Sequence, residues 1–177
     1  MVTSSGLKSP RVVVGDPQAI VDDLVAGRQH YGLAAAEVRY RDDQMVVLWL
    51  TLEPWAALAA ADYPTEQVAI SIWATGAVRA VPVNAHDRAW LHRNMYVPLH
   101  AVHIGSLCLW DPKDPRTLRW EWADGFDAYV TVVHRHLQAE EFWRRNKVWP
   151  SEDAPHGDGP HPIRTEAMRR LAVEGAA

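Results

Sequence analysis

The chain contains a single cysteine, Cys108. One cysteine cannot form a disulfide within the chain, which excludes the disulfide-stapled class of small secreted domains and favours a reducing compartment. The chain also lacks an apolar run of about 18 residues, the length needed to span a bilayer. Residues 1–10 are polar and carry no apolar segment of the signal-peptide kind. We therefore expect a cytoplasmic protein with no membrane partner.

The chain has no excess of basic residues: 18 Lys and Arg stand against 22 Asp and Glu, a net charge of -4. Nucleic acids are usually bound by a basic face, so we expect no nucleic-acid partner. Glycine-rich phosphate loops and Cys-x-x-Cys or His-x-x-x-His spacings are absent. His134 and His136 lie two apart and would project from different faces of a helix. No metal or other cofactor is therefore expected.

Phenylalanine is scarce, with two residues against nine tryptophans. Indole rings bury large areas but need an acceptor for the N–H, so this bias predicts a core built around tryptophan and an aromatic contact surface. A chain of 177 residues is long enough for one domain. We expect a flexible N-terminus over 1–10, a domain over 11–150, and a Pro-, Gly- and His-rich linker with a short helix over 151–177.

Helical and extended segments follow one another in a simple order. Asp16-Pro17 supplies an N-cap and a proline at the first helical position, after which apolar residues recur at helical spacing. Four runs rich in aliphatic and aromatic residues come next, with Asp42-Asp43 and Thr75-Gly76 as turns. These patterns predict a helix over 17–26, strands over 34–41, 44–52, 68–73 and 77–83, and an extended crossing segment over 86–103.

The clearest helical pattern follows Asp124, which is a plausible N-cap, and ends before Trp149-Pro150. Its apolar stripe comprises Phe126, Tyr129, Val130, Val133, Leu137 and Trp143. The opposite face is expected to be solvated and carries Arg135, Glu140, Glu141, Arg144 and Arg145. Helix, antiparallel meander, crossing segment and long helix together predict an α+β fold in which helices cover one face of the sheet.

Cys108 lies in a segment whose composition suits a nucleophile. A thiol reacts when it is reachable and partly ionised. Gly105 permits a tight bend before it, and Leu107 and Leu109 would anchor the chain on either side. A cysteine between leucines is nevertheless often a small buried hydrophobe, so these residues alone leave both interpretations open.

Residues 100–109 resemble the active-site stretch of ubiquitin-conjugating enzymes, in which a His-Pro-Asn element precedes glycine, any residue, an aliphatic residue, the catalytic cysteine and leucine. Residues 105–109, Gly-Ser-Leu-Cys-Leu, match the second half of that stretch. The His-Pro-Asn triplet is absent, and His100 stands where the family's asparagine would lie. The likeness is closer to bacterial ubiquitin-conjugating-enzyme-like (UBC-like) proteins of anti-phage CBASS and related ubiquitin-like operons. It covers about residues 17–156, including Trp120, Trp122 and Trp149-Pro150.

This resemblance implies a UBC-like α+β fold and an acyltransferase. Cys108 would accept the C-terminal acyl group of a ubiquitin-like protein from an activating enzyme supplied in trans, then pass it to a lysine of a target protein. His100 would stabilise the loop or the oxyanion, and His103 is a second candidate. Asp111 and Asp114 would orient or desolvate the lysine, although Asp-Pro pairs also initiate turns without any catalysis.

Two alternatives stay open from the sequence. The chain could be a non-catalytic UBC-like module that docks a ubiquitin-like or signalling-enzyme partner, which the missing triplet favours and the retained Gly-x-Leu-Cys-Leu setting opposes. It could also be a plain α+β domain with a buried, inert cysteine.

Overall fold

The structure is a computed structural model, and it describes residues 8–27, 32–84, 88–92, 105–110 and 114–150. The predicted linker and terminal helix over 151–177, most of the predicted crossing segment, and His100, His103 and Asp111 lie outside these ranges.

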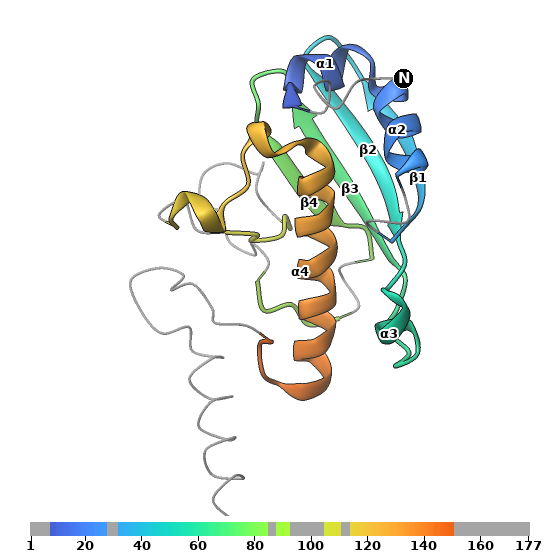
Figure 1. Cartoon of the computed structure of the whole chain (residues 1–177), viewed down its shortest axis with the longest axis vertical. Helices are drawn as coiled ribbons and strands as arrows, with labels where there is room; N and C mark the ends of the chain where they lie inside the picture. The colour runs from blue at the N-terminus through green and yellow to red at the C-terminus, as the bar shows by residue number, and fades with distance from the viewer. Residues whose placement is uncertain (1–7, 28–31, 85–87, 93–104, 111–113, 151–177) are drawn as a thin grey trace, which may run out of the picture.

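A four-stranded antiparallel sheet forms the centre of the fold (Figure 1). Its strands follow chain order, and each pairs with the next. The bounds are β1 (Leu33–Arg41), β2 (Met45–Leu52), β3 (Glu66–Trp73) and β4 (Val78–Pro82). All four predicted strands are confirmed. In β2 and β3 every second side chain is buried, so one face of the sheet is apolar and covered.

The two predicted turns are confirmed, and each depends on a single residue. Asp42 accepts backbone N–H bonds from Gln44 and Met45 at 2.8 and 2.7 Å, which closes the β1–β2 hairpin. Gly76 has a φ of 98°, and its N–H donates to the carbonyl of Trp73 at 2.9 Å. This left-handed conformation favours glycine between β3 and β4.

The helices are α1 (Pro10–Gly15), α2 (Pro17–Ala26), α3 (Ala56–Ala59) and α4 (Phe126–Asn146), with short 3-10 turns η4 (Arg116–Leu118) and η5 (Trp122–Asp124). The predicted helix over 17–26 is confirmed, and the Asp16 carboxylate accepts the N–H of Ala19 at 3.3 Å. Helix α1 was not predicted from the sequence, because its three valines are poor helix formers by propensity. Burial of Val13 and Val14 in the core outweighs that preference.

One hydrophobic core joins the sheet to the helices. The predicted apolar stripe of α4 is confirmed, since its five members from Phe126 to Leu137 are at most 1% exposed. The core also takes Val13, Val14, Ile20, Val21 and Leu24 from α1 and α2 and the inward residues of β2 and β3. All helical contributions therefore cover the same face, which confirms the α+β arrangement (Figure 1).

The expectation of a tryptophan-centred core is wrong. The largest fully buried side chains of the described residues are Tyr129, Phe126, several aliphatic residues, His134 and Glu140, and four of the indoles pack at the edge of the core. The indole N–H explains this position, because it needs an acceptor. Trp120 and Trp122 donate to the carbonyls of Gly125 and Gly76, each at 2.7 Å.

Two expectations about α4 are also wrong. Its N-cap is Gly125, with a φ of 95°, whereas Asp124 closes the preceding η5 turn and accepts the N–H of Glu121 at 2.9 Å. Glu140, assigned to the solvated face, is 0% exposed.

No described helix combines the length and the apolar character that a bilayer span requires.

Candidate functional site

The segment that carries Cys108 is bound to the edge of the sheet. The N–H of Leu107 donates to the carbonyl of Ala80 in β4 at 2.8 Å, and Leu107 is buried. Gly105 has a φ of 85°, so the predicted bend before the cysteine is present. Leu109 packs against the core on the other side. Cys108 itself is half-buried and lies in no disulfide, so the sulfur is held on a supported segment rather than in the core.

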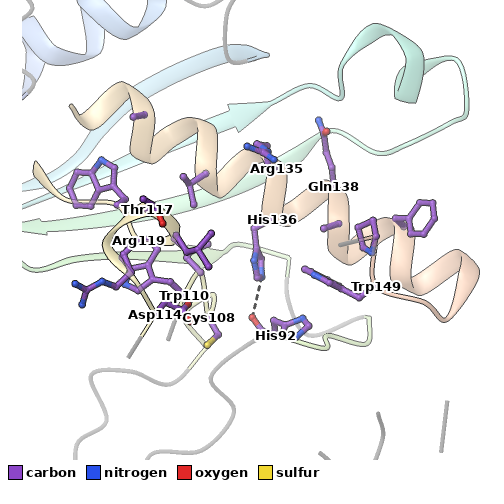
Figure 2. A pocket seen from close by; sticks show the side chains of 18 of the residues that line it. His92, Cys108, Trp110, Asp114, Thr117, Arg119, Arg135, His136, Gln138 and Trp149 are labelled. Carbon is purple, nitrogen blue, oxygen red and sulfur yellow. Dashed lines mark hydrogen bonds between the residues drawn. The ribbon is translucent and has the colours of Figure 1, made fainter. Parts of the chain in front are cut away.

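Cys108 lines a groove of about 1000 Å³ that runs along α4 (Figure 2). One wall is α4, which contributes Ala128, Val132, Arg135, His136, Ala139 and Phe142. The facing wall includes Leu109, Trp110, Asp114 and Trp120. Cys108 and Asp114, both predicted as site residues, therefore open into the same space.

Aromatic contacts hold the facing wall against the first half of α4. Trp120 packs edge-on against Tyr129, with ring centroids 4.9 Å apart, and Trp110 does the same at 6.1 Å. Trp122 stacks on Phe126 at 6.1 Å. Tyr129 is 1% exposed, and burial raises the pKa of its hydroxyl. These rings are part of the fold, and they fix the wall of the groove near Cys108.

Beyond Cys108 the groove reaches a buried cluster of His92, His136 and Glu140. The Nδ1 atom of His92 and the Nε2 atom of His136 lie 3.8 and 3.7 Å from Oε1 of Glu140. Trp149 packs its ring on His92, with centroids 4.2 Å apart, and on His136 at 5.6 Å. Charged or titratable side chains are rarely buried unless they are paired, and in this cluster the two histidines and the carboxylate pair with one another.

The backbone of His92 links this cluster to Cys108. Its carbonyl accepts the N–H of Cys108 at 2.9 Å and faces Nε2 of His136 at 3.2 Å (Figure 2). A carbonyl can only accept, so in this contact Nε2 of His136 carries the hydrogen. The cysteine amide and the histidine ring thus share one carbonyl oxygen.

The ionisation of Glu140 follows from its surroundings. Burial raises the pKa of the Glu140 carboxyl above its ordinary value. The N–H groups of Leu91 and His92 and the nearby guanidinium groups of Arg144 and Arg88 act in the opposite direction and limit the rise in pKa. Burial is the larger of these opposing effects, so the net shift in the pKa of Glu140 is upward.

Sequence reasoning missed His92, His136 and Glu140. The four-residue spacing of His136 and Glu140 on one helix was available as a signal. As predicted, His134 and His136 lie on different faces of α4. His134 is 1% exposed and contacts Gln138 at 2.7 Å, whereas His136 lines the groove. His92 carried no signal, since its partner Glu140 lies 48 residues further along the chain.

Among the described residues, no group of three or more His, Cys, Asp or Glu side chains has an arrangement that could hold a metal ion. Comparison of the chain with known protein families, with curated proteins and with solved structures found no match.

Proposed function

We propose that the chain is a UBC-like acyltransferase that carries an acyl group as a thioester on Cys108. The observation that carries the proposal is the setting of Cys108: a half-buried cysteine that lines a groove of about 1000 Å³, on a segment whose Leu107 and Cys108 amides are both hydrogen-bonded. A buried and inert cysteine would be expected among the core side chains, and Cys108 is absent from them. The match of residues 105–109 to the ubiquitin-conjugating pattern supports the same assignment.

The proposed reaction has two acyl transfers. In the first, the Cys108 thiolate attacks the thioester carbonyl of a ubiquitin-like protein carried by an activating enzyme. The bond from that carbonyl to Cys108 forms, the bond to the activating enzyme's sulfur breaks, and the released thiolate takes a proton. In the second, a lysine amine of the target attacks, an amide forms, and Cys108 leaves as the thiolate while the amine loses a proton.

The other residues have supporting roles in this proposal. His100 and His103 remain candidates for stabilising the oxyanion or the loop, and Asp111 and Asp114 remain candidates for orienting the lysine. Asp114 lines the groove with Cys108, which supports its part. The biological setting proposed from the resemblance is a bacterial anti-phage system with a ubiquitin-like partner.

The test is to incubate the chain with ATP, a bacterial ubiquitin-like protein and the activating enzyme of that protein. We expect wild type to form a covalent adduct that a thiol reductant removes. Cys108→Ser should form an oxygen ester that resists the reductant, and Cys108→Ala should form no adduct.

An adduct that is as abundant on Cys108→Ala as on wild type would overturn the proposal. Tight binding of the ubiquitin-like protein with no adduct on wild type would support the alternative, a UBC-like docking module.

A further inference from the structure

Residues Arg88–His92, here called the anchor segment, are fastened to α4 and β3 at several points. Arg88 pairs with Glu66 at the start of β3, and Glu66 also lies 3.7 Å from Arg144 of α4. The guanidinium groups of Arg88 and Arg144 lie 5.1 and 5.0 Å from the centroid of the Trp90 ring. Cation–π and ion-pair contacts of this kind, partly removed from water, hold a loop in one position.

Glu140 fastens the far end of the anchor segment. Its Oε2 atom accepts the N–H of Leu91 at 2.9 Å, and its Oε1 atom accepts the N–H of His92 at 2.6 Å. The next polar group along this backbone is the His92 carbonyl, which accepts the N–H of Cys108 at 2.9 Å. A continuous path of hydrogen bonds therefore runs from α4 through the anchor segment to the cysteine.

We infer that Glu140 is a positioning residue for Cys108, acting through the Leu91–His92 peptide groups that its carboxylate holds. The placement of the Cys108 amide follows from geometry alone, and its consequence for acyl transfer rests on the proposed function. Glu140 acts through the backbone, because its two carboxylate oxygens accept the N–H groups of Leu91 and His92.

The chemistry of the side chain explains why a carboxylate occupies a fully buried position. Burying it is costly unless both oxygens receive hydrogen bonds. Two adjacent backbone N–H groups need two acceptors, and a carboxylate supplies one on each oxygen. A glutamine of nearly the same shape supplies one acceptor and turns its NH₂ toward the second N–H, which leaves a donor facing a donor.

The test is amide hydrogen exchange in the full chain, comparing wild type with Glu140→Gln. We expect the N–H of Cys108 to exchange about tenfold faster in the variant, because local opening of this segment becomes easier by roughly the net contribution of one hydrogen bond. Leu107 is an internal control, because its N–H is bonded to Ala80 of β4 and does not depend on Glu140. Its exchange should stay unchanged.

A matched variant is Glu141→Gln, the same chemical change one residue further along α4, where the carboxylate pairs with Arg144 and Arg145. It should leave exchange at Cys108 as in wild type. Equal acceleration at Leu107 and Cys108 in Glu140→Gln would indicate general destabilisation and overturn the inference. Unchanged exchange at both amides would overturn it as well.

If Glu140→Gln does not fold, Glu140→Asp provides the same test, because the shorter side chain keeps the charge but withdraws its carboxylate from the N–H groups of Leu91 and His92. Selective acceleration at Cys108, about threefold, is then expected. Acceleration at both amides, or at neither, would overturn the inference.

A second readout is the rate of adduct formation in the reaction above, which should fall in Glu140→Gln and not in Glu141→Gln. If no variant and no wild-type protein forms an adduct, the proposed function fails while the exchange result still decides the positioning role. If adducts form at equal rates despite faster exchange at Cys108, the catalytic consequence of the positioning fails alone.

Discussion

Gly32, which precedes β1, has a φ of 67°, a conformation that side chains rarely adopt. A Cβ at this position would lie 2.5 Å from the carbonyl oxygen of Glu53 and 2.6 Å from Cε1 of His134. Because the backbone strain and the clash add together, Gly32→Ala should lower the free energy of unfolding by about 2 kcal/mol or more.

Urea denaturation measures this change, and Gly15→Ala is its matched control. A Cβ at Gly15 meets no atom within 4 Å. Since alanine is also the better helix former, Gly15→Ala should be neutral or stabilising by up to about 1 kcal/mol. Equal losses in the two variants would contradict this account of Gly32.

The buried carboxyl of Glu140 predicts a particular dependence of stability on pH. Burial raises its pKa in the folded state, so the folded protein binds the proton more tightly than the unfolded chain. The resulting stabilisation is complete below the unfolded pKa, about 4.3, and is lost as pH rises through the folded pKa.

Wild type should therefore lose stability relative to Glu140→Gln as the pH is raised from about 4 toward 7. Denaturant unfolding at several pH values measures the difference. A difference that is constant with pH, or that grows in favour of wild type as pH rises, would contradict a raised pKa.

At the scale of elements, the β1–β2 hairpin depends on Asp42. Its carboxylate accepts the hydroxyl of Tyr40 at 2.8 Å in addition to the two backbone N–H groups of the turn. The hydrogen bond from Tyr40 and then those from Gln44 and Met45 hold the pKa of Asp42 below its ordinary value. The stability that Asp42 contributes is present above the unfolded pKa and is lost as pH falls through the folded pKa.

Asp42→Ala should thus lower the unfolding midpoint at neutral pH and reduce the loss of stability on acidification. Asp43→Ala is the control, because Asp43 accepts a hydrogen bond from the Gln44 side chain, at 3.3 Å, and not from the backbone N–H groups that Asp42 binds. Thermal unfolding between about pH 3 and 7 compares them. An Asp42→Ala profile parallel to that of wild type would contradict this role.

Elements with a clean period or turn chemistry could be predicted from the sequence, and the contacts between them could not. Strands β1 to β4, α2 and the α4 stripe each carry their signal locally. Helix α1 has no such signal, because Val13 and Val14 are helical only through burial. Glu140 was predicted to be solvated, because no residue near it in the sequence indicated that the anchor segment would cover it.

The candidate site likewise has one part that could be predicted from the sequence and one part that could not. Cys108 and its flanking Gly105 and Leu107 could be predicted, since a bend and an apolar anchor are local properties. The cluster of His92, His136 and Glu140 could not, because it joins a loop to a helix more than 40 residues away through backbone hydrogen bonds. Long-range contacts of this kind leave no periodic pattern.

For the whole molecule, the described core draws its buried residues from Val13 to Leu137, and Trp149 closes over the histidines. All of these residues lie inside the domain predicted over 11–150, whose bounds stay a prediction. A chain that ends at Pro150 should therefore unfold cooperatively, with a free energy of unfolding within about 0.5 kcal/mol of the full chain. Denaturation of both chains tests this, and a loss of several times that amount would show that the domain extends further.

The most direct test of the central claim is to locate the acyl group by mass spectrometry of peptides after the full chain has reacted with a thioester of its ubiquitin-like partner. The acyl group should be on the peptide that contains Cys108, and it should be absent from that peptide in Cys108→Ala. An acyl group found on lysine residues alone, in equal amounts in wild type and Cys108→Ala, would contradict the assignment of Cys108 as the nucleophile.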